Sequence, residues 1–511
     1  MRCIPVLTLC VGWARVQLAN GISLVALMLL SAGAASAAPL HRYIVEVGES
    51  LDFLAVKACF DGKTPDTLMA ETSGAKTFLE DVRLLSAKPL PPQGGEVIAL
   101  DGAPDNTCVD YRVKLRPTTS AAQTGGPETR RIGRDLLTSV GNWLWRPGEL
   151  EEGADVELSF VLPAGVAVSA PWERAAADAA KPTFRLGPTP YNWPAVAAFG
   201  RFAETEVVVP GALLRLVILG GLSPAQQARA EQWVKGAAHN VTTLYGRFPV
   251  ESVQVIVAPT PRGRGPVPWA YVSRGGGAGV HLFIDPARAP EEFDRDWSLT
   301  HEMSHLFLPY VGARDAWLFE GLPTYLQNVL MVRGGAIEPQ EGWSRLIAGF
   351  QRGARAGTGL SLAQASERIA VRGNYQRVYW AGAAMMLDAD LRLREITQGR
   401  HSLDTALAGL AECCLAPVRR WSADELIATL DRITGTTVFG DVMREQFESD
   451  DFPDFKRVLV RAGVSVKDGE VVLDPAARGA PWRDALMSPP SKGQTFHHEG
   501  TKDTKEHEEK R

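Results

Sequence analysis

The stretch LTHEMSHLFLPYV, residues 299–311, places two histidines four positions apart, with a glutamate directly after the first. In an α-helix, residues i and i+4 lie on the same face, so His301 and His305 point in one direction. A helix presents two nitrogen ligands to a zinc ion in this way. Glu302 lies about 100° further round the helix and can reach a water molecule at the metal without being a ligand. The alternative is a helix with two partly exposed histidines and no metal.

A catalytic zinc site needs a third protein ligand, and the stretch WLFEGLPTYLQ (317–327) offers one. Glu320 stands among apolar residues, where a carboxylate must be paired or must coordinate an ion. A helix break at Pro309–Gly312 lets the chain reverse, so a second helix can carry Glu320 back to the histidines. Pro323 is expected to kink or loosen that second helix. The alternative is a surface glutamate on an amphipathic helix.

These two stretches together resemble the glutamate-zinc metallopeptidases of clan MA, in which a second helix supplies a glutamate ligand in a Trp-x-x-Glu-Gly context. Further stretches are similar to the glycyl aminopeptidase family, which carries a Tyr-x-x-Gly-Ala helix and then a Leu-Asp-x-x-x-Arg pattern. These stretches are SLAQAS (361–366), VYWAGAAMMLDADLRLREITQGRHSLDTAL (378–407) and FPDFKRVLVRAGV (452–464). The resemblance covers about residues 200–465. It implies that His301, His305 and Glu320 bind Zn²⁺, that Glu302 is the general base, and that Tyr379 is the oxyanion donor.

Tyr379 also has a chemical argument of its own. Peptide hydrolysis through a tetrahedral intermediate needs a hydrogen-bond donor for the developing oxyanion besides the metal, and a tyrosine hydroxyl lining the cleft can provide it. Tyr375 lies one helical turn earlier and can be mistaken for it. The alternative is that Tyr379 is only an aromatic side chain at the edge of the core.

One stretch departs from the aminopeptidase pattern. Related aminopeptidases hold the free amine of the substrate with a glutamate in a glycine-rich motif on the edge strand before the zinc helix. The corresponding stretch here, RGGGAGVHLFID (274–285), has no glutamate. We interpret its glycines as allowing a peptide backbone to approach the edge strand closely. His281 is either a substrate or metal contact or an ordinary strand histidine.

The order of the predicted elements indicates an α+β fold. Alternating patterns such as RYIVEV (42–47) and TCVDYRVKL (107–115) predict an N-terminal β-sandwich-like domain, and helical patterns dominate after the zinc helix. The resemblance implies a thermolysin-like, mainly helical zinc peptidase domain. We therefore predict a signal peptide at 1–37, a β-rich domain at 38–205, the catalytic domain at 206–465, and a C-terminal extension at 466–511 that is largely disordered from about residue 482.

The N-terminal stretch GISLVALMLLSAGAASA (21–37) is apolar and ends in small residues, which predicts a secretory signal peptide cleaved after Ala37. The alternative is an uncleaved membrane anchor, although the apolar stretch is shorter than the ~20 residues that a span needs. We therefore expect an exported protein, either periplasmic or secreted. The net charge of −5 predicts no nucleic-acid surface, and we expect no stable membrane contact after removal of the signal.

Four cysteines follow the predicted signal peptide, and export makes disulfides permissible. We expect Cys59 and Cys108 to pair, because both lie in the predicted β domain. Cys413 and Cys414 are adjacent and poorly placed to bridge each other. No cysteine has the spacing of a zinc finger, so the metal site depends on histidine and glutamate.

The sequence thus predicts an exported zinc-dependent peptidase that acts on peptides or proteins through metal-activated water. The resemblance favours an aminopeptidase acting on peptides with a small N-terminal residue, glycine or alanine. One alternative is a zinc endopeptidase or oligopeptidase, which the missing amine-binding glutamate favours. Another is a catalytically silent peptide-binding protein of the same fold.

Overall fold

A computed structural model gives the fold of the chain from residue 39 onward. It describes residues 39–84, 96–115, 129–148, 154–176, 181–260, 263–357, 359–371, 373–416 and 418–489. The predicted signal peptide at 1–37 and the end of the predicted tail, beyond residue 489, lie outside these ranges. Residues 38–511 form one compact unit.

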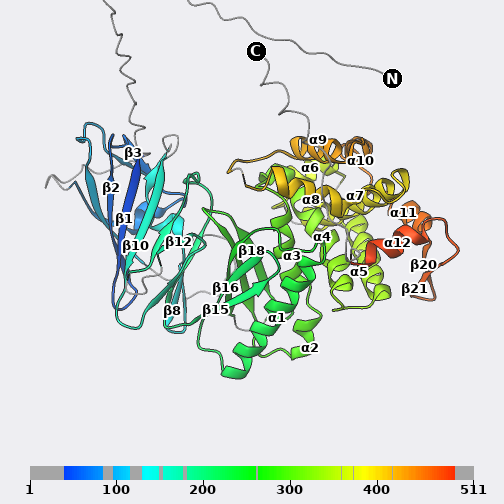
Figure 1. Cartoon of the computed structure of the whole chain (residues 1–511), viewed down its shortest axis with the longest axis horizontal. Helices are drawn as coiled ribbons and strands as arrows, with labels where there is room; N and C mark the ends of the chain where they lie inside the picture. Colours follow the sequence, from blue (N-terminus) through cyan, green and yellow to red (C-terminus); the bar gives the residue numbers. More distant parts are fainter. Residues whose placement is uncertain are drawn as a thin grey trace, which may run out of the picture. The chain divides into compact units, whose positions relative to one another are not determined.

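The first part of this unit is rich in sheet (Figure 1). Its strands are β1 (Leu40–Val47), β2 (Phe53–Phe60), β3 (Thr67–Met69), β4 (Leu79–Leu84), β5 (Val97–Ala99), β6 (Cys108–Lys114), β7 (Arg130–Ile132), β8 (Asp135–Ser139), β9 (Arg146–Pro147), β10 (Asp155–Val161), β11 (Ala167–Ser169), β12 (Glu173–Ala176), β13 (Thr183–Arg185) and β14 (Val196–Gly200). They form a seven-stranded sheet, β12-β13-β10-β1-β2-β6-β4, a four-stranded sheet, β11-β14-β8-β7, and a three-stranded sheet, β5-β3-β9.

Alternation of apolar and polar residues explains this packing. In β1, every second side chain is buried, from His41 to Val47, because successive side chains point to opposite faces of a strand. The buried faces of the seven-stranded and four-stranded sheets contribute to one core that includes Trp143, Phe160 and Phe199. The sandwich-like N-terminal part expected from the sequence is therefore present.

The disulfide pattern partly follows the prediction. Cys59 in β2 and Cys108 in β6 are directly opposite each other and are bonded, with Cα atoms 4.0 Å apart, which confirms the expected pair. Cys413 and Cys414 also form a disulfide with each other, which corrects the expectation that they are poorly placed to do so. Helix α8 ends at Cys413, and Cys414 has already left the helical conformation, so the two side chains can meet.

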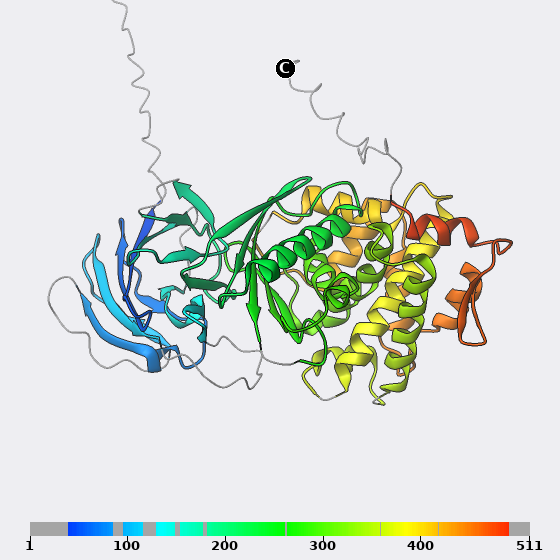
Figure 2. The same cartoon turned by 90° about the horizontal axis from the view of Figure 1, so that it is seen from below.

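A five-stranded sheet follows, with helix α1 on one face (Figures 1 and 2). Its elements are β15 (Glu204–Val209), β16 (Ala212–Ile218), α1 (Pro224–Thr242), β17 (Ser252–Pro259), β18 (Trp269–Ser273) and β19 (Ala278–Ile284). The inner strands β16, β17 and β19 are parallel, and β15 and β18 are antiparallel edge strands. One face shares a core with α1 and α3, and the other packs against β8 and β14 through residues such as Leu137, Ile256 and Phe283.

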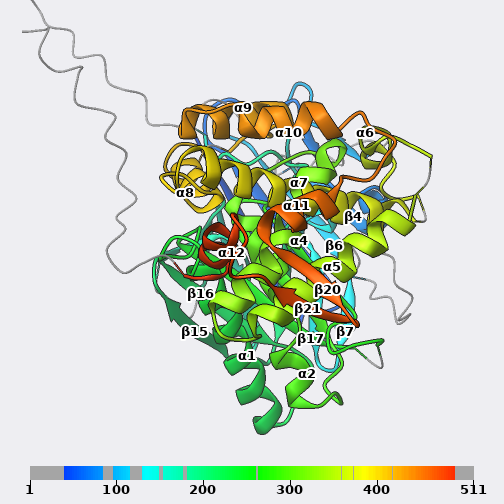
Figure 3. The ribbon, with the colours of Figure 1, turned by 90° about the vertical axis from the view of Figure 1, so that its right-hand side faces the viewer.

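The rest of the chain is mainly helical (Figure 3). Its elements are α2 (Pro290–Asp294), α3 (Ser298–Ser304), α4 (Ala316–Arg333), α5 (Pro339–Arg355), α6 (Leu362–Glu367), α7 (Asn374–Ile396), α8 (Leu403–Cys413), α9 (Ala423–Thr434), α10 (Val438–Gln446), α11 (Phe455–Ala462), β20 (Val464–Lys467), β21 (Glu470–Leu473) and α12 (Ala480–Met487). Helices α4 and α7 are almost wholly buried, so the other helices surround this pair. Within the described ranges, every helix is too short or too polar to cross a membrane.

The segment after residue 465 differs from the predicted disordered tail. Residues 464–473 form the hairpin β20–β21, and α12 continues to Met487, beyond the expected start of disorder at about 482. Leu486 is fully buried, and the buried guanidinium of Arg483 donates hydrogen bonds to the main-chain oxygens of Gly463 and Asp474. The buried face of α12 and the hydrogen bonds of Arg483 therefore hold this segment on the helical core.

Candidate metal centre

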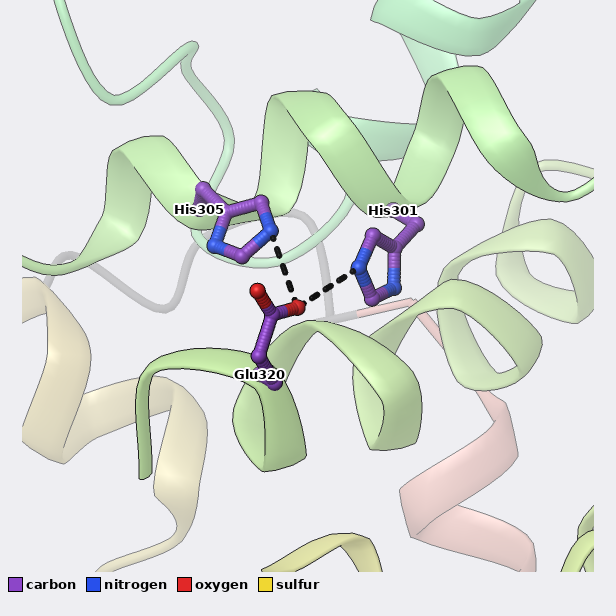
Figure 4. A group of neighbouring side chains, drawn as sticks. All are labelled: His301, His305 and Glu320. Carbon is purple, nitrogen blue, oxygen red and sulfur yellow. Dashed lines mark hydrogen bonds and ion pairs between the residues drawn. The ribbon is translucent and has the colours of Figure 1, made fainter. Parts of the chain in front are cut away.

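The motif HEMSH lies on a short, fully buried helix. Helix α3 covers Ser298–Ser304, and a single 3₁₀ turn, His305–Phe307, continues it. Leu299 and Met303 pack into the core from this helix. Figure 4 shows that His301 and His305 project from one side of the helix toward a second helix. The histidine spacing therefore does what the sequence predicts, because one turn separates the two rings.

Glu320 comes from that second helix, α4, and meets both histidines (Figure 4). Its Oε2 atom is 3.3 Å from Nε2 of His301 and 3.5 Å from Nε2 of His305. One ligand atom from each of the three residues lies within 4.8 Å of the other two. Two imidazole nitrogens and one carboxylate oxygen are the donor set of a catalytic zinc site with a fourth position free for water. The residues present therefore fit Zn²⁺.

Two glycines bring helix α4 close to helix α7. A Cβ atom on Gly321 would lie 2.5 Å from Cα of Gly382, and one on Gly382 would lie 1.9 Å from the main-chain oxygen of Trp317. Only residues without a side chain permit so close a crossing. Glu320 precedes the first glycine, and Tyr379 lies one turn before the second, so the crossing places both beside the histidines. Helix α4 runs through Pro323 without ending.

Glu302 lies beside the three ligand residues, but its carboxylate is further from the histidines than that of Glu320. The Oε2 atom of Glu302 is 3.9 Å from Nε2 of His305, whereas Oε2 of Glu320 is 3.5 Å from the same nitrogen. Burial raises the pKa of Glu302 to about 7, although the charge of His301 opposes the rise. A carboxyl group with a pKa near neutrality is suited to take up and release a proton.

The charges of the ligand residues depend on one another. Burial disfavours a charged His301, but the hydrogen bond to Glu320 and the nearby carboxylates outweigh it and raise its pKa. Burial lowers the pKa of His305 to about 3. Burial disfavours a charged Glu320, but the two histidines hold its pKa below the ordinary value. A neutral imidazole and an ionised carboxylate are the forms that bind a metal, and His305 and Glu320 are held in them.

Tyr379 lies over the same site from helix α7. Its ring stacks on His301 with centroids 6.0 Å apart and planes within 4°, and its hydroxyl hydrogen-bonds Glu320. Burial and the neighbouring carboxylates raise its pKa, so the hydroxyl keeps its proton. Tyr375 is half exposed one turn away, with its ring edge toward Tyr379. The structure therefore places Tyr379, rather than Tyr375, against the ligand residues.

Gln327 is a residue of the site that the sequence analysis missed. Its Oε1 atom accepts a hydrogen bond from Nδ1 of His301 at 2.8 Å, and the side chain is buried. This bond leaves Nε2 of His301 free to act as the ligand atom. The signal was available, because Gln327 lies two helical turns after Glu320 and therefore shares its helix face.

No protein-family model and no curated protein matches the sequence. The structure is similar to an aminopeptidase N family protein from Idiomarina loihiensis, with a TM-score of 0.63 and 15% identity over 84% of this chain and 79% of that chain. It is also similar to an M1 zinc metallopeptidase mutant from Deinococcus radiodurans bound to a Tyr-Ser-Ala substrate, with a TM-score of 0.55 and 13% identity over 81% and 95% of the two chains.

The fold is that of M1 zinc metallopeptidases. In its coarse features it combines an N-terminal part rich in sheet with a helical C-terminal part. Because the sequence identities are 15% or lower, this similarity establishes the fold alone, and the chemistry of the site depends on the residues of this chain.

The glycine-rich stretch packs against loops of the N-terminal part. The main-chain N–H of Gly275 donates to the oxygen of Pro194 at 2.8 Å. A Cβ atom on Gly277 would lie 2.0 Å from the main-chain oxygen of Pro171. Contacts within the chain therefore account for Gly275 and Gly277. The interpretation that the glycines allow a peptide to approach the edge strand stays a prediction.

Arg274 and His281 flank these glycines. Nη2 of Arg274 donates to the main-chain oxygen of His305. Burial lowers the pKa of Arg274 to about 10, and the ionisable group that counters this is Tyr310 rather than a carboxylate. His281 is fully buried in β19, where its Nε2 atom is 2.9 Å from Oγ of Ser273. Burial lowers the pKa of His281 to about 3, so it is a neutral strand histidine, which was the simpler of the two interpretations.

Replacing Gln327 tests its role in orienting His301. We expect Gln327→Leu to weaken zinc binding by about 10- to 100-fold, because the ring loses the partner that fixes its tautomer. Gln327→Glu keeps an oxygen acceptor and should bind zinc nearly as tightly as the wild type. Competition with a fluorescent chelator measures both affinities, and circular dichroism checks the fold. Equal zinc affinity in the leucine variant would remove Gln327 from the site.

Proposed function

We propose that the chain is a zinc-dependent peptidase. The observation that carries the proposal is the convergence of Nε2 of His301, Nε2 of His305 and a carboxylate oxygen of Glu320 within 4.8 Å, with Glu302 beside them. The fold supports it, since the similar structures are zinc metallopeptidases and one of them holds a peptide. The finer expectation of a thermolysin-like catalytic domain at 206–465 is part of the same proposal.

The side chains of the site divide the work of hydrolysis. When bound there, zinc polarises the scissile carbonyl and makes water a better nucleophile near neutral pH. Glu302 takes the proton of the attacking water and delivers it to the leaving nitrogen. The protonated hydroxyl of Tyr379 donates a hydrogen bond to the oxyanion. Gln327 holds His301 in the tautomer that leaves Nε2 free.

Within this function, the resemblance to glycyl aminopeptidases favours substrates with a free N-terminal glycine or alanine. A peptidase of this type must neutralise the α-ammonium of its substrate, because an unpaired buried cation is costly. The stretch 274–279 supplies no carboxylate for this purpose.

A second candidate, an endopeptidase or oligopeptidase, is favoured by Arg274. This partly buried arginine contacts the main chain of His305 and occupies the stretch where related aminopeptidases place their amine-binding glutamate. A positive charge at this place opposes the binding of an ammonium group. An endopeptidase has no such group to bind.

One pair of peptides decides between the candidates. An aminopeptidase should lose nearly all activity when a glycyl or alanyl peptide is N-acetylated, whereas an endopeptidase should cut both forms at similar rates. Chelation should stop either reaction, and added zinc should restore it. A zinc-bound protein that hydrolyses neither form, nor longer end-blocked peptides, would instead be the catalytically silent peptide binder.

We further propose that the protein is exported, to the periplasm or the medium, after cleavage near Ala37. The sequence of residues 1–37 motivates this, and the two disulfides are compatible with an oxidising compartment. N-terminal sequencing of the protein from the medium or periplasm would identify the cleavage site, and retention of the full-length chain in the cell would contradict the proposal.

A further inference from the structure

A cleft of about 740 Å³ lies next to the candidate metal centre. Its walls include Gln327 and Tyr379, both of which contact the ring of His301. The ligand residues themselves do not line the cleft, but it begins one side chain away from His301, within reach of a peptide bound at the metal centre. A cleft of this size is far larger than the side chain of glycine or alanine needs.

Two exposed aromatic side chains also line this cleft. Trp297 is 44% exposed and Tyr375 is 50% exposed. Among the described residues, the other large apolar side chains of comparable exposure are all valine or isoleucine. Single exposed aliphatic residues are ordinary on a protein surface, but exposed aromatic residues that share one concave site indicate a place where an apolar group binds.

Both aromatic residues are held by the helices that build the site. Trp297 precedes His301 by one turn, with ring centroids 5.6 Å apart and an edge-on angle of 81°. Tyr375 precedes Tyr379 by one turn, with centroids 6.4 Å apart and an angle of 89°. One helical turn therefore sets the position of each ring relative to the candidate site: Trp297 relative to His301, and Tyr375 relative to Tyr379.

Charged residues of both signs also line the cleft. Among its arginines, Arg295 and Arg345 are both paired with Glu341, at 2.6 and 2.7 Å, and Arg352 lies over the ring of Trp380. Exposed ion pairs of this kind contribute little to the binding of a third charge. The aromatic surface is thus the feature that can select among uncharged side chains.

We propose that Trp297 and Tyr375 form a subsite that binds a large apolar side chain, aromatic or branched aliphatic, of the peptide residue adjacent to the scissile bond. The proposal rests on the peptidase function above and narrows its substrate class. A small N-terminal residue would leave this cleft unfilled, so an aminopeptidase acting on glycyl or alanyl peptides would use it for the residue after the scissile bond. An endopeptidase can use it on either side.

Two series of fluorogenic peptides test the subsite, one varying the residue before the scissile bond and the other the residue after it, through alanine, leucine and phenylalanine. In one of the series, the wild-type kcat/KM for phenylalanine should exceed that for alanine by at least about tenfold, because a phenylalanine side chain would bury several more carbon atoms in the subsite than alanine does. Similar values for all three residues in both series would overturn the proposal.

Variants then assign the preference to the two rings. The double variant Trp297→Ala/Tyr375→Ala should reduce the phenylalanine-to-alanine ratio to within about twofold, and Trp297→Phe and Tyr375→Phe should keep most of it. Ile396→Ala is the matched control, because Ile396 is an exposed apolar residue at the other end of α7. A double variant that keeps the wild-type ratio would overturn the proposal. Elemental analysis of each variant separates lost zinc from altered selectivity.

A measurement of peptide binding distinguishes failure of the subsite from failure of the peptidase function. If the wild type cuts none of the peptides, the peptidase proposal fails and calorimetry with the zinc-loaded protein decides the subsite. The phenylalanine peptide should then bind at least about tenfold more tightly than the alanine peptide to the wild type, and equally to the double variant. Equal affinities in the wild type would overturn the subsite.

Discussion

The variant His301→Ala/His305→Ala should contain no tightly bound zinc and should have no measurable peptidase activity, while the wild type binds one zinc ion. The two Nε2 atoms supply two of the three ligand atoms that converge on the site. Glu320 alone is left in the variant, and one carboxylate does not hold zinc against dilution. Elemental analysis after gel filtration measures the metal, and a peptide assay with added zinc measures the activity.

The control for this variant is His239→Ala, since His239 is an exposed histidine in the last turn of α1. It should keep both zinc and activity. A double variant that retains one zinc ion would show that the ligands are misassigned. A wild-type protein without tight zinc would remove the metal from the mechanism altogether.

The local parts of the site could be predicted from the sequence. His301 and His305 are related by a single helical turn, so their common direction follows from helix geometry once the helix is recognised. Glu320 could be identified because a carboxylate in an apolar segment needs a partner. In the structure it faces both histidines. The alternating strands of the N-terminal part and the Cys59–Cys108 pair followed from equally local patterns.

The parts that depend on distant contacts could not be predicted in this way. Tyr379 was assigned through a family resemblance, because its approach to Glu320 depends on the crossing of α4 and α7 at Gly321 and Gly382. The pairing of Arg274 with the main chain of His305 has no sequence pattern. The contacts of the glycines after Arg274 could not be predicted for the same reason, since the surface against which they pack lies in another part of the chain.

Short-range geometry can also mislead. The adjacent cysteines 413 and 414 were expected to be poorly placed to bridge each other, yet the chain leaves its helix between them and they bond. Helix α12 was assigned to the tail because the sequence from about residue 482 onward is rich in proline, lysine and glutamate. Average composition does not reveal that a single buried face, with Leu486 and Met487, is enough to hold a short helix.

Glu302→Gln should retain its zinc and lose turnover by a factor on the order of a thousand. Glutamine has nearly the same size as glutamate, so it fits the buried position, but its amide cannot accept and return a proton. Zinc should stay because Glu302 is not one of the converging ligands: its Oε2 atom is 3.9 Å from Nε2 of His305, while that of Glu320 is 3.5 Å away. Substrate binding depends on other surfaces, so KM should change much less than kcat.

Two quantities are measured for each protein: the zinc content, and kcat with a saturating concentration of peptide. Glu251→Gln, at an exposed glutamate before β17, makes the same chemical change away from the site and should match the wild type in both. Turnover near the wild-type rate in Glu302→Gln would exclude Glu302 as the general base. Loss of zinc would place Glu302 among the ligands instead. Unchanged zinc with a thousandfold slower reaction is the result that only proton transfer by this carboxylate explains, because the metal, its three ligands and Tyr379 all remain in place.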